Sequence, residues 1–119
     1  MKENELKSCI SDNLEYGTKQ GRWYSDRLNS GSVLVKKGAK VYKVQLCREG
    51  TADFMVIQNS WTNAYPTHIN VEHPRIIFLE LKGEKGKQRP EQKEFQKLIE
   101  AQGAEYYIIK SLEDLEEIL

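Results

Sequence analysis

Apolar residues near the start of the chain recur at the spacing of an amphipathic helix. Leu6, Ile10 and Leu14 stand four residues apart, which places them on one face of a helix. The spacing predicts a helix over residues 3–16. We expect Gly17 to end it, because glycine commonly follows the last turn.

Two further helices are predicted in the second half of the chain. Pro90 and Gly103 bracket a stretch with an apolar stripe. Proline favours the first turn of a helix and glycine the position after the last. Ser111, with Asp114 three residues on, has the pattern of a helix N-cap. The sequence therefore predicts a helix over residues 90–102 and a short final helix after Ser111.

Five stretches have the composition and alternation of β-strands. They are residues 33–36, 41–47, 53–57, 75–82 and 105–110. The first two are expected to form a hairpin, and the fourth is apolar on both faces, as in a central strand covered from both sides. The resulting order is α-β-β-β-β-α-β-α. It predicts one α/β (α+β) domain over residues 1–119, with a central mixed β-sheet flanked by helices.

Charge is distributed unevenly although its total is zero. Lys and Arg number 18, and so do Asp and Glu, so no overall basic field indicates a nucleic-acid partner. Residues 33–48 and 82–89 are nevertheless rich in cations, whereas residues 101–119 hold five acids and one lysine. We expect one basic face of the kind that phosphate contacts require. Ordinary solvated lysines are the alternative.

Cysteine usage and the N-terminal residues bear on the compartment. Cys9 and Cys47 match no metal-ligand spacing. We therefore expect both cysteines to be buried as small apolar residues, in a protein from a reducing environment. Met1-Lys-Glu-Asn-Glu opens with charge, which is unlike a signal peptide. The longest apolar run is too short to cross a bilayer. These features predict a soluble, cytoplasmic protein without a membrane partner.

The segment from Asp53 to Lys82 carries the chemistry. Side chains alternate along a strand, so Glu80 and Lys82 share one face. If the strands that begin at Asp53 and end at Lys82 pair as an antiparallel hairpin centred between residues 66 and 67, Asp53 lies opposite Glu80. Two carboxylates and a lysine then meet at one rim of the sheet.

These groups suit metal-dependent hydrolysis of a phosphodiester. Mg²⁺ or Mn²⁺ prefers oxygen ligands, which Asp53, Glu80 and the backbone carbonyl of Leu81 would supply. Such an ion lowers the pKa of bound water and neutralises phosphate charge. Lys82 would hydrogen-bond the attacking water and offset charge in the transition state. The alternative is an exposed cross-strand ion pair.

Gln92 is the second informative side chain. It shares a helical stripe with Phe95, Leu98 and Ile99, so we expect it to face inward from the first turn. A buried glutamine needs hydrogen-bond partners. It would orient the water or a DNA phosphate. A partly exposed glutamine at a helix start is the alternative.

An ordered series of motifs resembles a known nuclease family. The series is Arg27-x-Asn-Ser-Gly31, Gly50-Thr-Ala-Asp53, Leu79-Glu-Leu-Lys82, Gly86-Lys-Gln-Arg-Pro-Glu-Gln92 and Gly103-Ala-x-Tyr-Tyr-Ile-Ile. It is similar to the VRR-NUC domain, the virus-type replication-repair nuclease branch of the PD-(D/E)XK superfamily, over essentially the whole chain. Ala52 stands where the superfamily name has proline, a position that does no chemistry.

The resemblance implies a metal-dependent DNA nuclease. Asp53 and Glu80 would be metal ligands, Lys82 the catalytic lysine and Gln92 the active-site glutamine. The family also tends to carry an acid on the first helix that reaches the metal; Glu3 fits best, with Glu5 as its rival. Stand-alone members are phage or bacterial proteins that dimerise, which implies a bacterial or phage-infected cell and a homodimer that pairs two sites on branched DNA.

Other polar residues are candidates for DNA contact. Arg27 can grip a phosphate with two hydrogen bonds, and Asn29 and Ser30 follow it; a structural turn is the alternative. Three cations flank the site in the loop that follows Lys82. For these side chains, contact with the DNA backbone is favoured over simple exposure to solvent. They are Lys85, Lys87 and Arg89.

The polar loop over residues 59–74 is longer than the resemblance requires. It holds Trp61, Tyr65, His68 and His73, which suggests base stacking or a metal. If Asp53 pairs with Glu80, however, the loop closes the opposite end of the hairpin, roughly 17–20 Å away. For this loop we therefore favour a structural role or a dimer contact over DNA contact, and DNA contact over metal ligation.

The leading hypothesis is therefore a Mg²⁺- or Mn²⁺-dependent endonuclease acting on branched DNA, such as a Holliday junction or a flap. One alternative is a non-catalytic nucleic-acid-binding module of the same fold. Another is a structural phage protein. If the protein is an endonuclease, a helicase partner could deliver its substrate. Symmetric cutting of a junction would need a C2 dimer.

Overall fold

A four-stranded mixed sheet forms the centre of the computed structural model, which describes residues 2–59 and 74–119. Its strands, in spatial order, are β1 (Tyr24–Arg27), β4 (Phe54–Gln58), β5 (Arg75–Leu81) and β6 (Glu105–Ile109). β1 and β5 each pair antiparallel with β4, and β6 runs parallel to β5. The predicted mixed sheet is confirmed.

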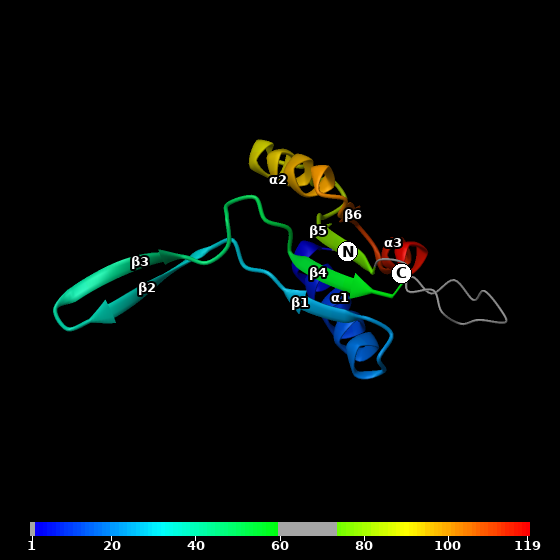
Figure 1. Ribbon diagram of the computed structural model, residues 1–119, viewed down its shortest axis with the longest axis horizontal. Coiled ribbons are helices and arrows are strands. Elements are labelled where there is room, and N and C mark those ends of the chain that lie inside the picture. The colour runs from blue at the N-terminus through cyan, green and yellow to red at the C-terminus, as the bar shows by residue number, and fades with distance from the viewer. Residues whose placement is uncertain (1, 60–73) are drawn as a thin grey trace.

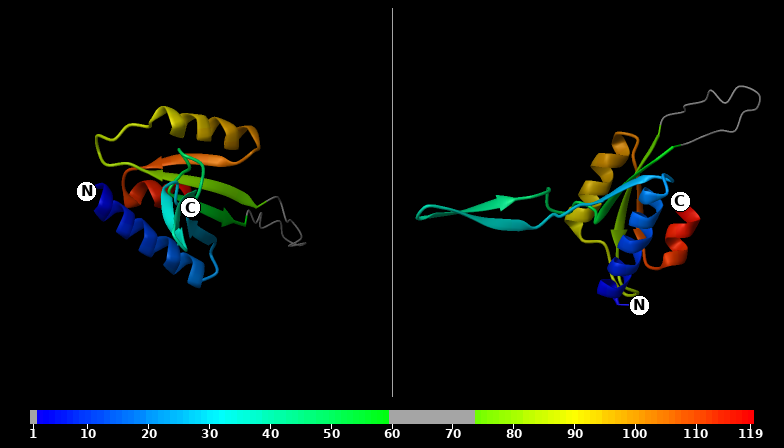
Figure 2. Two further views of the ribbon diagram at one scale, coloured as in Figure 1. Left: turned by 90° about the vertical axis from the view of Figure 1, so that its left-hand side faces the viewer. Right: turned by 90° about the horizontal axis from the view of Figure 1, so that it is seen from below.

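Helices cover both faces of this sheet, as predicted (Figures 1 and 2). The helices α1 (Glu3–Lys19) and α3 (Leu112–Ile118) pack on one face, and α2 (Pro90–Ala101) packs on the other. The larger core lies beneath α1 and α3. Its buried residues are Leu6, Ile10, Leu14, Phe54, Val56, Ile77, Leu79, Leu81, Ile109 and Leu115.

The hairpin of β2 (Ser32–Lys37) and β3 (Lys40–Gln45) stands apart from the central sheet. It projects from the end of the body where β4 begins (Figure 1). Gly38 lies in its tight turn with φ +62°, a conformation that glycine adopts without strain. The predicted hairpin is confirmed. The structure separates it from the central sheet, because among the described strands β2 and β3 pair only with each other.

The predicted element order is wrong because it lacks one strand, β1. This strand has four residues, of which Tyr24, Asp26 and Arg27 are exposed, and among the described strands it pairs only with β4, at the edge of the sheet. Such a segment lacks the apolar alternation that signals a strand. Arg27, expected in a turn, is the last residue of β1.

Gly17 does not end the first helix. α1 continues to Lys19, and Gly17 is buried inside it. A Cβ at this position would overlap the ring of Trp23, whose Nε1 donates a hydrogen bond to the carbonyl of Leu14 at 2.9 Å. The glycine thus makes room for tryptophan against the helix, a tertiary reason that a local pattern does not reveal.

The remaining helix predictions largely hold. α2 begins at Pro90, and the Ser111 hydroxyl accepts a hydrogen bond from the backbone N–H of Asp114 at the start of α3. Leu98 does not face inward as expected; it is 40% exposed. Cys9 and Cys47 are half-buried rather than buried. The expected role of residues 59–74 rests almost wholly on positions outside the described residues.

Candidate active site

The register between β4 and β5 brings the predicted acids together. Phe54 pairs with Leu79 in an antiparallel ladder, so the preceding residue, Asp53, lies opposite Glu80. This is the pairing that a hairpin centred between residues 66 and 67 predicts. Both acids therefore reach the end of the sheet from which the β2–β3 hairpin projects (Figure 1).

A hollow of about 330 Å³ opens at this end of the sheet. Three carboxylates and three cationic side chains line it, so its formal charge balances. The lining residues are Glu3, Lys7, Ser30, Thr51, Asp53, Glu80, Leu81, Lys82, Arg89 and Gln92. Residues far apart in the sequence thus form one polar site.

Strand alternation positions Glu80, on β5, and Lys82, the residue after β5, as predicted. Leu79 and Leu81 are buried in the core under α1, whereas Glu80 and Lys82 line the hollow. Glu80 is only 4% exposed and Lys82 only 9%. The alternative of an exposed surface ion pair is therefore wrong, because both charged groups are buried.

Asp53 is held by contacts from two elements. Its Oδ2 accepts a hydrogen bond from the backbone N–H of Leu81 at 2.8 Å. Its Oδ1 lies 3.7 Å from Nζ of Lys7 on α1. The first contact fixes the carboxylate against β5, and the second supplies a compensating charge.

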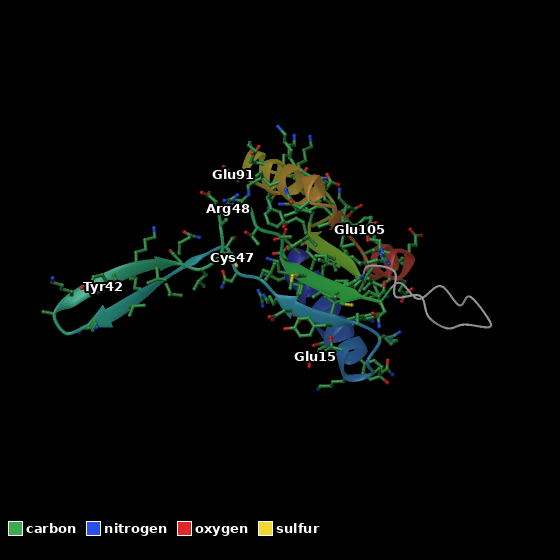
Figure 3. The ribbon with its side chains drawn as sticks, viewed as in Figure 1. Glu15, Tyr42, Cys47, Arg48, Glu91 and Glu105 are labelled. Carbon is green, nitrogen blue, oxygen red and sulfur yellow. The ribbon has the colours of Figure 1, made fainter. Side chains whose placement is uncertain are left out.

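Gly50 allows the chain to reach Asp53 along the start of α2. Its φ is +88°, and a Cβ here would overlap the backbone carbonyl of Glu91. Only glycine combines this backbone angle with so close an approach. In Figure 3, Glu91 and Arg48 are labelled in this region, beside the base of the hairpin. The Gly50-Thr-Ala-Asp53 motif thus joins the hairpin, α2 and the acid site.

Glu80 is the most constrained acid. Its Oε1 accepts a hydrogen bond from Nε2 of Gln92 at 2.7 Å and lies 3.7 Å from Nζ of Lys82. Its Oε2 is buried and has no hydrogen-bond partner among the described residues. Burial, together with the charge of Asp53, raises the pKa of Glu80 to about 7 against the opposing effect of Lys82 and Lys7.

Gln92 faces inward as predicted. It is 3% exposed, and its Oε1 accepts a hydrogen bond from the backbone N–H of Arg89 at 2.8 Å. That bond caps the start of α2 and leaves the amide nitrogen directed at Glu80. The side chain therefore orients a carboxylate, and the alternative of a partly exposed glutamine is wrong.

The donor set fits a hard divalent cation. Asp53 and Glu80 supply two carboxylates, and one Glu80 oxygen is buried with no partner within residues 2–59 and 74–119. Leu81 donates its N–H to Asp53, whereas the next N–H, of Lys82, points to Ile109 on β6. The N–H and C=O of one strand residue point to the same side, so the Leu81 carbonyl also faces the Asp53 side.

No group of three His, Cys, Asp or Glu side chains arranged to hold a metal occurs within residues 2–59 and 74–119. A cation at this site would therefore use the two carboxylates, the carbonyl and water. Magnesium sites commonly have this composition, because the ion keeps several of its waters.

The other predicted residues divide into two groups. Glu3, Ser30 and Arg89 line the hollow. Arg27, Asn29, Lys85 and Lys87 are exposed and do not line it, and neither does Glu5. Asn29 instead accepts a hydrogen bond from the N–H of Gly31 at 2.8 Å, which supports its alternative role in a turn.

Lys7 and Thr51 are lining residues that the sequence reasoning missed. Lys7 stands one helical turn after Glu3, and their charged groups lie 3.9 Å apart. That spacing is visible in the sequence and places both on one helix face. The sequence does not show that this face meets Asp53.

A larger hollow, of about 820 Å³, lies against α2 and the starts of β5 and β6. Its lining is mostly apolar and includes Ile76, Phe78, Leu98 and Ile99. The charged residues there, Arg75 and Glu105, are paired with each other at 2.8 Å. It offers no group suited to phosphodiester chemistry, so the smaller polar hollow is the candidate site.

No protein-family model matches the chain, and no curated protein matches it either. None of the described helices is both long enough and apolar enough to cross a lipid bilayer. The basis for a functional proposal is therefore the polar hollow, whose lining includes Asp53, Glu80, Lys82 and Gln92.

Proposed function

We propose that this chain is a Mg²⁺- or Mn²⁺-dependent endonuclease that hydrolyses phosphodiester bonds in DNA, of the VRR-NUC type within the PD-(D/E)XK superfamily. One observation carries the proposal. Buried Glu80 lies opposite Asp53, and one of its oxygens has no hydrogen-bond partner in the described part of the chain. Gln92 fixes it beside the ammonium group of Lys82. Burying such charges is costly, and perturbed acids of this kind concentrate at functional sites.

The metal would be held by Asp53, Glu80 and the Leu81 carbonyl. Glu3, in the first turn of α1, is a further carboxylate at the edge of the same hollow. When bound, a divalent cation supplies Lewis acidity, which neutralises charge on the phosphate and makes bound water acidic.

Lys82 contributes a fixed positive charge. Its Nζ lies 3.7 Å from Glu80 Oε1, too far for a hydrogen bond, so its protons remain available to another oxygen. Lys82 would donate a hydrogen bond to the attacking water, keep its own proton, and offset charge that develops on the phosphate. Such preorganised groups stabilise a transition state more than a ground state.

The remaining lining residues suit substrate binding. Arg89 and Lys7 present cations at the hollow, and Ser30 presents a hydroxyl. A backbone phosphate accepts hydrogen bonds from all three types of group. Gln92 acts through Glu80, which it orients, and is a positioning residue.

The proposed substrate is branched DNA. Each chain has one such hollow among its described residues. Symmetric cutting of a four-way junction needs two sites related by a two-fold axis, and a C2 homodimer provides them. A monomer would instead cut a flap or nick one strand.

Cleavage of four labelled substrates (four-way junction, flap, duplex and single strand) tests the proposal. We expect Mg²⁺-dependent cutting that is lost in Glu80→Ala and in Lys82→Ala. Glu94→Ala and Lys97→Ala are matched controls, because both side chains are exposed on α2 and neither lines the hollow.

The result that would overturn the proposal is cutting by the Glu80 and Lys82 variants at the parental rate. Tight binding of DNA without cutting in either Mg²⁺ or Mn²⁺ would instead support a nucleic-acid-binding module of the same fold.

A further inference from the structure

The β2–β3 hairpin is an exposed arm. Every residue of both strands is exposed, and among the described helices and strands β2 and β3 contact only one another. Figure 3 shows Tyr42 on the projecting part of the hairpin and Arg48 at its base. An isolated two-stranded hairpin is marginally stable in water, so an exposed arm of this kind gains stability from a partner.

Positive charge dominates this part of the chain. Residues 27–48 contain six cations and no acid. Four of the cations are on the arm itself: Lys36, Lys37, Lys40 and Lys43. A segment with this charge favours a polyanion over an average protein surface.

The arm begins and ends at the rim of the polar hollow. Ser30 precedes it, Thr51 follows it, and both line the hollow with Asp53 and Glu80. Its base is fixed by hydrogen bonds from the N–H of Leu46 to the Gly31 carbonyl at 3.0 Å and from the N–H of Cys47 to the Asn29 carbonyl at 2.8 Å. A polymer cut in the hollow would therefore lie close to the arm.

The two faces of the arm differ. On one face, Val33 pairs with Val44 and Val35 with Tyr42, followed by the pair Lys37 and Lys40 beside the turn. The four apolar side chains are 41–47% exposed. On the other face, Leu34 lies opposite Lys43 and Lys36 opposite Val41. The arm is thus a ribbon with an apolar strip on one face, two lysines beside the exposed Leu34 and Val41 on the other face, and a pair of lysines at the tip.

We propose that this hairpin is an arm that holds the duplex next to the cut by entering its major groove. The proposal rests on the proposed function only for the location of the scissile phosphate. The major groove admits a two-stranded β-ribbon, and thymine methyl groups offer it apolar contacts. The lysines at the tip and on the reverse face would bind the phosphates that border the groove.

The dimensions of the arm set its reach. Each strand has six residues, which span about 20 Å at 3.4 Å per residue. Duplex DNA advances about 3.4 Å per base pair. The arm would therefore cover about six base pairs of the duplex that flanks the hollow.

Binding of a fluorescent duplex, measured by anisotropy in EDTA, tests the arm without requiring cleavage. The test variant carries Lys37→Gln, Lys40→Gln and Lys43→Gln. The control variant carries Lys19→Gln, Lys93→Gln and Lys97→Gln, which remove the same charge from exposed positions on α1 and α2. We expect the arm variant to bind at least about tenfold more weakly, with a salt slope reduced by about 2.7, and the control to change little.

A second variant tests the reach. Replacing residues 33–44 with Gly-Gly removes the arm but leaves its base, and the body should fold because no other described element contacts β2 or β3. The parent should bind more tightly as the flanking duplex is lengthened from about three to about nine base pairs. The armless variant should not respond to flank length.

The outcomes separate this inference from the proposed function. Equal binding by the arm and control variants overturns the inference even if the parent cuts DNA. A lysine effect without any metal-dependent cutting supports the arm and overturns the nuclease. If Val35→Ser with Tyr42→Ser converts a dimer to a monomer and leaves DNA affinity unchanged, the strip binds a second copy of this chain and the inference is wrong.

Discussion

The polar hollow and the β2–β3 hairpin differ in how far contacts within the chain bury and hold their side chains. In the hollow, charged groups are buried and held by neighbours: Glu80 is 4% exposed and bonded to Gln92, which is in turn bonded to Arg89. On the hairpin, Leu34 is 74% exposed, and no other helix or strand that the structure describes contacts the two strands. Buried polar groups and exposed apolar groups are the two informative departures from the usual placement of polar residues outside and apolar residues inside.

This difference indicates two kinds of function. A preorganised set of buried groups suits chemistry, because their positions are fixed before substrate arrives. An exposed arm that the described residues fix at its base suits binding, since a partner would complete its surface. Changes in the hollow should therefore alter reaction rate and stability, whereas changes on the arm should alter affinity.

The largest expected contrast concerns folding. Leu79 is fully buried in the core under α1, so Leu79→Ala should lower the free energy of unfolding by about 2–5 kcal/mol. Val35→Ala on the arm should change it by less than about 0.5 kcal/mol. Urea denaturation monitored by circular dichroism measures both. Comparable losses in the two variants would show that the arm is part of the folded core.

The next contrast concerns the pH dependence of metal-free protein. The pKa of Glu80 is raised from 4.5 to about 7, so the native state binds more protons than the unfolded state between these values. Its contribution to stability is thus present below pH 4.5 and is lost as pH rises through 7. Glu80→Gln removes this titration and should stabilise the protein by about 3 kcal/mol at pH 8, and by about 1 kcal/mol at pH 5.

Metal binding should reverse the order of stability of the parent protein and Glu80→Gln. A cation that binds the native state alone stabilises it by mass action. At pH 8, adding Mg²⁺ should raise the melting temperature of the parent and leave that of Glu80→Gln nearly unchanged. An equal rise in both would mean that Glu80 is not a ligand.

A smaller effect is expected at the opposite end of the sheet. Arg75 and Glu105 form two hydrogen bonds, each 2.8 Å long, and this contact lowers the pKa of Glu105. Its stabilising contribution is present above the ordinary value of 4.5 and is lost as pH falls through the lowered value. Because the pair is part-exposed, Glu105→Gln should cost only about 1 kcal/mol at pH 7. That cost should shrink in acid, as measured by urea denaturation at each pH.

Much of the site could be predicted from the sequence because strand geometry is regular. The period of two fixes the faces of Glu80 and Lys82, and the antiparallel register fixes Asp53 opposite Glu80. The inward position of Gln92 follows in the same way from the helical period.

The failures of prediction have a common cause, which is tertiary contact. Gly17 has the local signal of a helix end, but its missing side chain accommodates Trp23 within the helix. The role of Lys7 depends on how α1 lies across the sheet, which no local pattern specifies. The four-residue strand β1 is held by its pairing with β4 and carries little propensity of its own.

A Mn²⁺ soak of crystals, with anomalous diffraction from the metal, tests the central claim most directly. We predict one or more peaks bounded by the carboxylates of Asp53 and Glu80 and the carbonyl of Leu81, with the Lys82 ammonium group adjacent. Well-ordered side chains around the hollow with no peak at millimolar Mn²⁺ would contradict the assignment of this site as a metal-dependent nuclease centre.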